Sequence, residues 1–489
     1  MSLFSPPFPT GLPIGTSWQA TKTTAPVIFP FDGSRICDGP VGDTEDANAA
    51  LDHALAIRQK VGGLSSYARK ELLARTCTAL ATRREAFETL LVLETGKPLR
   101  DCVIEVARTI LTLETAAGEV SRLHGETVPL DLLPSGEGMV GFWVRKPIGV
   151  IVGITGFNYP LLLASHKLAP AIAAGCPVII KPAPQTPLAT LWLIHIMREI
   201  AATLDIPQGI VQLVTGDAVV GAILVSDPRV GAVSFTGSAG VGHAISKLAA
   251  PRKTLLELGS NSALIVDASA DIEAAAGAAV RGSYYASGQA CISVQRVIVL
   301  ESVADAFIAS LKKQMAAVVV GDPRNAATHI SALINQASTT RVSEWMAQAV
   351  AAGAVIAHGG TLSGGAFQPT VIIDPPSGTL VWDEEIFGPV MCIRRVQDID
   401  AAFALVNDSR YGLHASIFTS SLANTFAALN TLEVGGVVVN EVPGFRSDSM
   451  PYGGVKDSGI GREGPRFAAE EFTVTRMAII RPSIKRSNS

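Results

Sequence analysis

The sequence lacks paired cysteines, an excess of positive charge and a long apolar run. Its six cysteines are scattered without a CxxC pair, which argues against a disulfide framework or a metal site and favours a reducing compartment. Lys plus Arg number 39 and Asp plus Glu 43, a net charge of −4, so no basic surface for nucleic acid or an anionic membrane is expected. The longest apolar stretch is interrupted by His166 and Lys167, and no signal-peptide pattern is seen. These absences predict a cytoplasmic protein with no membrane or nucleic-acid partner.

What is present indicates a large folded chain. Hydrophobic residues make up 48% of the 489 residues and charged residues 17%, which excludes a disordered protein. At roughly 150 residues per domain, the length favours about three domains or sub-domains.

Two series of alternating strands and helices organise the chain. Residues 1–40 are turn-rich, helical patterns follow, and short apolar runs then alternate with helices up to KTLLELG. A second alternating series begins after Gly259. This cadence predicts an α/β fold with a doubly wound, Rossmann-type first domain over 1–123 and 147–258 and a second α/β domain over 259–470.

Two segments, 124–146 and 471–489, belong to neither series. Both have strand-like stretches and could pair as edge strands with another copy of the chain. They are interpreted as oligomerisation segments of a homodimer or homotetramer.

Cys291 is the first candidate for chemistry. A free cysteine is most often a small buried hydrophobe, and that alternative stays open. However, Ser287, Gly288, Gln289 and Ser293 make its surroundings a polar junction before an apolar strand, where reactive groups tend to lie.

Glu257 ends the strand KTLLELG, at the sheet edge where open α/β sheets bind ligands. It is either solvated there or partly buried with a raised pKa that would suit a general base. An ordinary edge glutamate is the alternative.

Asn158 and Ser238 each follow a strand and precede a helix. The Asn158 amide could cap the helix that starts at Pro160, or donate to a developing oxyanion. Ser238 could cap the helix after SFTGS, whose free N–H groups suit a phosphate. Because this loop lacks the G-x-G-x-x-G order, it is weak evidence for a dinucleotide on its own.

Seven strings in register resemble the aldehyde dehydrogenase superfamily over almost the whole chain. They are GFNYP, IIKPAPQTPLAT, SFTGS with Gly242, LLELGSNSALIV, SGQACISVQR, EEIFGPV and MPYGGVKDSGIGRE. The separation of 34 positions from Glu257 to Cys291 is similar to the family's spacing of base and nucleophile.

The resemblance implies oxidation of an aldehyde to an acid with NAD or NADP. Cys291 would attack as a thiolate, Asn158 and the Cys291 N–H would hold the oxyanion, and Glu257 would activate water against the thioester. Lys167 and Glu463 match positions associated with proton relay. The first domain would then bind the cofactor and the second would be catalytic.

The resemblance also implies a set of cofactor-binding residues. Lys181 would lie at the adenine ribose, Ser238 at the pyrophosphate and Glu385 at the nicotinamide ribose, with Phe387 beside it. The full set is Thr155, Gly156, Phe157, Lys181, Ala183, Pro184, Gly216, Gly237, Ser238, Glu257, Leu258, Gly259, Glu385 and Phe387.

Two departures from the family pattern affect the cofactor loops. Pro184 stands where NAD-preferring members carry a glutamate, so NADP becomes admissible and the choice between the two stays open. Gly156 replaces a proline of many members and is expected to change loop stiffness more than chemistry.

The substrate is expected to be a small polar or anionic aldehyde. The strings CISVQR and NEVPGFRSDSMPYGGVKDSG resemble the branch that handles lactaldehyde, glycolaldehyde, sulfolactaldehyde and phosphonoacetaldehyde. Arg108 and Arg446 could bind an anionic group, or could be surface salt-bridge partners. His166 and Tyr285 stand where succinic semialdehyde enzymes usually carry arginine, which disfavours that substrate.

Two other functions remain to be weighed. One is a coenzyme A-acylating enzyme, which the presence of Glu257 disfavours because such members generally lack it. The other is a non-catalytic member of the family, which intact Cys291, Glu257 and Asn158 argue against.

Overall fold

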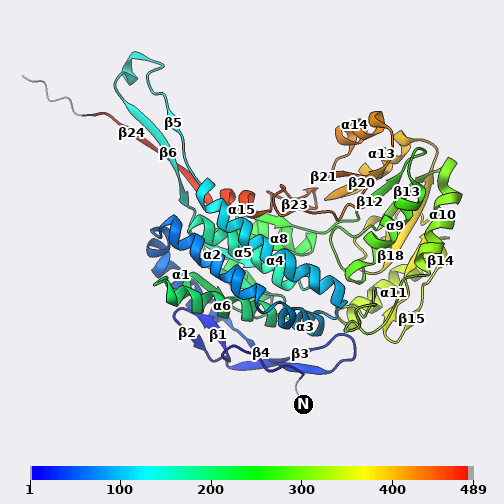
Figure 1. Ribbon diagram of the computed structural model, residues 1–489, viewed down its shortest axis with the longest axis horizontal. Helices are drawn as coiled ribbons and strands as arrows, with labels where there is room; N and C mark the ends of the chain where they lie inside the picture. Colours follow the sequence, from blue (N-terminus) through cyan, green and yellow to red (C-terminus); the bar gives the residue numbers. More distant parts are fainter. Residues whose placement is uncertain (1–2, 483–489) are drawn as a thin grey trace, which may run out of the picture.

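Two open sheets flanked by helices form the body of the molecule, and a small third sheet projects from it as an arm (Figure 1). The computed structural model describes residues 3–482. Helices and parallel strands alternate in both large sheets, so the α/β fold expected from the sequence is confirmed.

The first sheet has six strands, parallel except for one short antiparallel edge strand. In spatial order they are β23 (Gly459–Ile460), β11 (Lys253–Glu257), β10 (Val230–Thr236), β7 (Val150–Ile154), β8 (Val178–Lys181) and β9 (Val211–Leu213). The helices around it are α1 (Thr44–Gly62), α2 (Ser66–Ala81), α3 (Arg84–Thr95), α4 (Leu99–Glu119), α5 (Pro160–Ala174), α6 (Leu188–Thr203), α7 (Ala218–Ser226), α8 (Ala239–Ala249) and α15 (Pro465–Glu471).

The second sheet has seven strands, of which only the edge strand β14 is antiparallel to its neighbour. In spatial order they are β14 (Val355–His358), β17 (Thr370–Ile373), β18 (Val390–Val396), β13 (Arg296–Leu300), β12 (Ala263–Val266), β20 (His414–Phe418) and β21 (Gly436–Val439). Its helices are α9 (Ile272–Tyr284), α10 (Glu301–Met315), α11 (Gln336–Ala351), α12 (Leu380–Asp383), α13 (Ile399–Asn407) and α14 (Leu422–Thr431). Apolar side chains form one core cluster around the first sheet and two around the second.

The arm consists of β5 (Thr127–Val128), β6 (Val140–Pro147) and β24 (Thr473–Ile480). β6 and β24 pair antiparallel over their full length within the same chain. The two expected oligomerisation segments therefore pair with each other. Residues 483–489 of the second segment lie outside the described residues.

The N-terminal segment is more regular than its turn-rich sequence suggests. It forms two antiparallel pairs, β1 (Leu12–Ile14) with β2 (Ser17–Gln19) and β3 (Thr23–Ile28) with β4 (Arg35–Val41). The short edge strand β23 and helix α15 lie with the first sheet, although the sequence assigns their residues to the second domain; the domain limits stay a prediction. Between residues 3 and 482, no helix combines the length and apolarity that a membrane crossing requires.

Candidate active site

A cavity of about 1160 Å³ brings the main candidate residues together. Asn158 reaches it from the loop between β7 and α5, Glu257 from the end of β11, and Cys291 from the loop before β13. Because β7 and β11 are parallel members of one sheet, their carboxyl ends open at the same edge. The second sheet supplies the loop that carries Cys291 and the loop before β18 that carries Glu385 and Phe387.

A strained turn presents Cys291. Ala286, Ser287 and Gly288 have φ of 49°, 56° and 73°, a left-handed region in which residues other than glycine are uncommon. A Cβ on Gly288 would lie 2.1 Å from the carbonyl oxygen of Gly388, so only glycine fits there. Side-chain contacts hold the turn: Ser287 Oγ accepts from the N–H of Ser331 at 2.9 Å.

The Cys291 thiol is partly buried and faces the cavity. Its Sγ lies 3.4 Å from the hydroxyl oxygen of Tyr452. Burial raises the pKa of the thiol to about 12, against the lowering effect of the Tyr452 contact. Cys291 is therefore part of the cavity lining, which favours the reactive role over that of a small core hydrophobe.

The Asn158 side chain crosses to the Cys291 loop. Its Nδ2 donates to the carbonyl oxygen of Gln289 at 2.8 Å. The first turn of α5 has no side-chain cap from its N-cap residue Tyr159, so Asn158 does not play the capping role considered from sequence. Because an amide nitrogen carries two hydrogens, a second N–H of Asn158 remains available beside the cavity.

Glu257 is buried rather than solvated, being 7% exposed. Its Oε2 has no hydrogen-bond partner among the described residues. Burial, followed by the negative charge of Glu463, raises the pKa of Glu257 well above the usual glutamate range. Of the two environments considered from sequence, the buried one with a raised pKa is confirmed.

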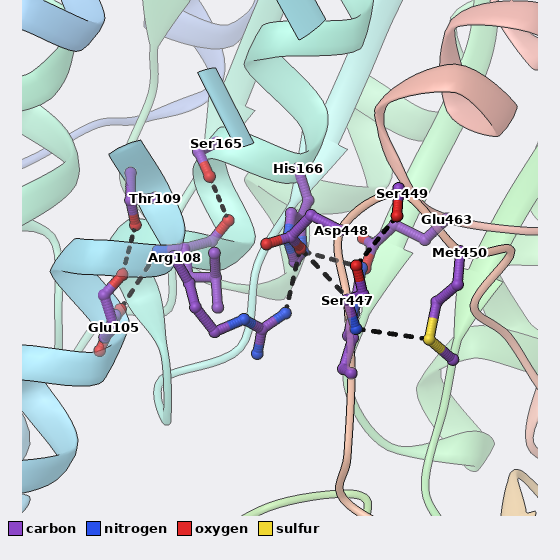
Figure 2. A network of polar contacts seen from close by, with 12 residues as sticks. Glu105, Arg108, Thr109, Ser165, His166, Ser447, Asp448, Ser449, Met450 and Glu463 are labelled. Carbon is purple, nitrogen blue, oxygen red and sulfur yellow. Dashed lines mark hydrogen bonds and ion pairs between the residues drawn. The ribbon is translucent and has the colours of Figure 1, made fainter. Parts of the chain in front are cut away.

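A network of opposite charges acts on Glu257, and Figure 2 shows its members Glu463, His166, Asp448 and Arg108. Lys167 Nζ donates to Thr236 Oγ1 at 2.7 Å and lies 3.5 Å from Glu463 Oε1. The other Glu463 oxygen lies 3.0 Å from His166 Nδ1 and 3.1 Å from Arg446 Nη2. Burial alone would raise the pKa of Glu463, but the charges of His166 and Lys167 hold it well below its usual range. These contacts therefore favour the ionised form of Glu463 although the group is buried.

The chain continues through Asp448 to the cavity wall. Asp448 Oδ1 lies 3.4 Å from His166 Nε2 and 3.1 Å from Arg108 Nη2. Although burial opposes it, these two partners lower the pKa of Asp448. Neither His166 nor Asp448 was assigned a role from sequence, because each is a single polar residue whose partners are distant along the chain.

Arg108 and Arg446 both line the cavity, but they differ in how tightly they are held. The Arg446 side chain is 6% exposed, and its guanidinium lies 3.9 Å from the ring centroid of Tyr452. The Arg108 side chain is 24% exposed, and its buried Nε has no hydrogen-bond partner among the described residues. Both arginines are therefore salt-bridge partners, as that alternative expected, but both also line the cavity and Arg446 is buried.

The expected cofactor residues divide into two groups. The cavity itself is lined by Gly156, Phe157, Gly237, Ser238, Glu257, Leu258, Gly259, Glu385 and Phe387. The others are not among its lining residues, namely Thr155, Lys181, Ala183, Pro184 and Gly216. Lys181 is 7% exposed, and burial lowers its pKa.

The lining suits a nicotinamide dinucleotide. The Ser238 side chain does not cap α8, so the capping role considered for it is wrong and the first N–H groups of the helix remain for a phosphate. A Cβ on Gly259 would lie 2.6 Å from Glu385 Oε2, so glycine permits the close approach of that carboxylate. Burial raises the pKa of Glu385 to about 7, while the Ser260 N–H donates to its Oε1 at 3.0 Å.

Comparison with known proteins gives one consistent result. The model of the aldehyde dehydrogenase family matches residues 18–478. The chain is 39% identical over 471 residues to 3-sulfolactaldehyde dehydrogenase of Priestia megaterium, covering 96% of this chain and 98% of that protein. It is 36% identical over 440 residues to lactaldehyde dehydrogenase of Methanococcus maripaludis, covering 90% and 93%.

Solved structures agree with the sequence comparisons. Glyceraldehyde-3-phosphate dehydrogenase of Methanocaldococcus jannaschii, complexed with NADP, superposes with a TM-score of 0.91 at 33% identity and covers 94% of this chain and 100% of its own. Betaine aldehyde dehydrogenase of Staphylococcus aureus, in complex with NAD⁺, gives 0.93 at 29% identity and covers 99% and 97%.

Proposed function

The chain belongs to the aldehyde dehydrogenase family, and from this premise we propose that it oxidises a small polar or anionic aldehyde to the free carboxylic acid. As a member of that family it is an oxidoreductase that uses NAD or NADP. The observation that carries the proposal is the convergence of Cys291, Asn158 and Glu257 on one cavity.

Cys291 forms the bond to the substrate. Its thiol loses a proton to a nearby base, for which the Glu257 carboxylate is suited by its raised pKa. The sulfur then adds to the aldehyde carbon and gives a thiohemiacetal, whose oxyanion accepts hydrogen bonds from the free N–H of Asn158 and the backbone N–H of Cys291. The existing contact of Asn158 with Gln289, 2.8 Å long, keeps the amide oriented before substrate arrives.

Oxidation and hydrolysis complete the reaction. When bound, the nicotinamide cofactor supplies the hydride acceptor that turns the thiohemiacetal into a thioester. After Glu257 has released the thiol proton, it takes a proton from water, and the resulting hydroxide adds to the thioester carbon and displaces the Cys291 thiolate, which releases the acid. Because Glu463 is held charged by His166, Lys167 and Arg446, it keeps Glu257 basic, while Lys167, whose pKa burial lowers, passes protons onward.

The cofactor would lie along the carboxyl edge of the first sheet. Gly237 and Ser238 would hold its phosphates at the start of α8, and Glu385 would hold the nicotinamide ribose beside Phe387. Buried Lys181 and its neighbours in the next loop would serve the adenosine half. Pro184 supplies no carboxylate to repel a 2′-phosphate, so both cofactors belong in the assay.

Two arginines and two relatives support the substrate class. Arg108 and Arg446 place guanidinium groups on the cavity wall, where a carboxylate, sulfonate or phosphonate would be recognised by charge-assisted hydrogen bonds. Similar proteins are named for 3-sulfolactaldehyde and lactaldehyde, which are small and polar. Arg108 is the better anchor, because it is paired with Asp448 alone among the described residues and is more exposed, whereas Arg446 contacts Asp448, Glu463 and Tyr452.

The test is a panel of short neutral and anionic aldehydes, each assayed with NAD and with NADP. We expect NAD(P)H and free acid to appear in equal amounts, with no dependence on coenzyme A. Accumulation of an acyl-CoA ester would overturn the hydrolytic step, and no reduction with any aldehyde would overturn the proposal.

Arg108→Met is expected to raise the KM for an anionic aldehyde and leave that for propanal almost unchanged. Losing a hydrogen bond to a charged group costs about 1.5–3 kcal/mol, or about 10- to 150-fold in KM. The matched control is Arg122→Met, which removes an arginine from an ion pair with Glu119 outside the cavity lining. Equal effects on both aldehydes would remove Arg108 from the anion site.

The arm supports assembly with a second copy of the chain. Its strands expose apolar side chains, among them Val140, Val474, Met477, Ile479 and Ile480, and β24 is an edge strand of its sheet. We expect light scattering to give the mass of a homodimer or homotetramer, and a monomer would contradict this.

All six cysteines are unpaired, which supports a cytoplasmic location.

A further inference from the structure

Three charged residues at the start of α4 have no part in the chemistry above. Lys97 lies two residues before α4, while Asp101 and Glu105 lie four residues apart in its first two turns and so share one helix face. They are 3%, 4% and 0% exposed, although charged groups are seldom buried without a specific partner. We call these three residues the α4 clamp.

Glu105 and Lys97 hold the segment that carries Asn158. Helix α5 begins with Pro160, which has no N–H, and the N–H of Leu163 is bonded to Tyr159. The two N–H groups left in the first turn, those of Leu161 and Leu162, both donate to Glu105 Oε1 at 3.0 and 3.1 Å. A carboxylate from another helix therefore completes the cap that no local side chain provides.

Lys97 contacts Asn158 itself. Its Nζ donates to the backbone carbonyl oxygen of Asn158 at 2.8 Å and forms an ion pair with Glu105. The same Nζ lies 3.7 Å from the ring centroid of Tyr159, where a cation and an aromatic ring attract. Lys97 therefore contacts both the backbone of Asn158, whose side-chain amide faces the cavity, and the residue that follows it.

Asp101 holds the segment that carries Cys291. Its Oδ2 accepts a hydrogen bond of 2.9 Å from the N–H of Ala286, the first residue of the left-handed turn before the cysteine. Since Asn158 Nδ2 donates to Gln289 in that same loop, the two loops are joined directly to each other and also to one helix.

We propose that Lys97, Asp101 and Glu105 are positioning residues that set the distance between the Asn158 amide and the Cys291 thiol. The inference rests on the proposed function, since it assigns to the clamp the geometry of that reaction. A donor shifted by about 1 Å from the developing oxyanion can cost about a hundredfold in rate, so a rigid charged clamp would act on kcat more than on KM.

The chain offers a matched control for a purely structural role. Glu94 is also fully buried, and it caps α6 in the same manner, accepting from Leu188 and Ala189 at 2.8 and 3.0 Å. It does not line the cavity. Removing either carboxylate should lower thermal stability, but only Glu105 should affect the chemical step.

A double-mutant cycle with Asn158→Ala tests the proposal. We expect Glu105→Leu to lower kcat about 10- to 100-fold with less than a threefold change in KM, and Glu105→Gln, which keeps an acceptor oxygen, to recover part of the loss. In the Asn158→Ala background the same change should cost less than about threefold, because Glu105 acts through Asn158. Equal losses in both backgrounds would overturn the proposal. If Glu105→Leu does not fold, Lys97→Met takes its place in the cycle.

Hydrogen exchange separates this proposal from the proposed function. Glu105→Leu should speed exchange at 158–163, and Asp101→Leu at 286–291, while Glu94→Gln changes neither segment. Unchanged exchange would overturn the clamp even if aldehydes are oxidised. Absence of aldehyde oxidation by the wild-type protein, with exchange altered as expected, would instead overturn only the proposed function.

Discussion

Cys291→Ala is expected to lower steady-state aldehyde oxidation by at least about 10⁴-fold and to leave NAD(P) binding unchanged. The sulfur forms the only covalent bond to the substrate in the proposed reaction, and removing a nucleophile costs rates of this order in other enzymes. Stopped-flow absorbance should show no burst of NAD(P)H, whereas fluorescence titration should return the wild-type Kd for the cofactor.

Cys77→Ala is the control for this variant. Cys77 is also a partly buried thiol, which packs against the first apolar core and donates a hydrogen bond to the carbonyl oxygen of Ile110. Its replacement should leave both the burst and the steady state unchanged. A Cys291→Ala protein that retains even a tenth of the wild-type rate would rule out the covalent mechanism.

The positions of Glu257 and Cys291 could be predicted from the sequence because they depend on patterns within short stretches of the chain. Glu257 stands at the end of an apolar strand, and Cys291 follows the glycine that its turn requires. The alternating series that predicted two sheets depends on periodicity within short windows, which the chain preserves over both halves. The apolar character of β7 and β8, for example, is continuous because both faces are covered.

Other parts depend on contacts between residues far apart in the chain. His166 is separated by about 300 residues from both Asp448 and Glu463, so no short stretch of sequence contains both members of either pair. The same holds for the pairing of β6 with β24 and for the grip of Glu105 on α5. The N-terminal pairs β1–β2 and β3–β4 were missed for another reason: three- to seven-residue strands among prolines and glycines carry little periodic signal.

Glu257→Gln is expected to separate the two halves of the reaction. The variant should still release about one NAD(P)H per active site, in a burst slower than that of the wild type because Glu257 no longer accepts the thiol proton. Hydrolysis of the thioester should then slow by about 10²- to 10⁴-fold, the usual contribution of a general base. The covalent acyl-enzyme should accumulate and be visible as a mass increase on Cys291.

The pH dependence of thioester hydrolysis is a second test of Glu257 as the general base. Only the ionised carboxylate can take a proton from water, and burial together with the charge of Glu463 raises the pKa of Glu257 well above the usual range. The hydrolysis rate should therefore climb with pH as Glu257 loses its proton, at a higher pH than an ordinary glutamate would give, and this limb should be absent in Glu257→Gln.

Glu94→Gln tests whether loss of any buried carboxylate changes the burst, the steady-state rate and the pH dependence in the same way. Burial raises the pKa of Glu94 to about 8, but this group caps a helix away from the cavity. Its variant should keep the wild-type burst, steady state and pH limb. If Glu257→Gln instead matches the wild-type steady-state rate at every pH, water is activated by another group, and the raised basicity of Glu257 has no role in hydrolysis.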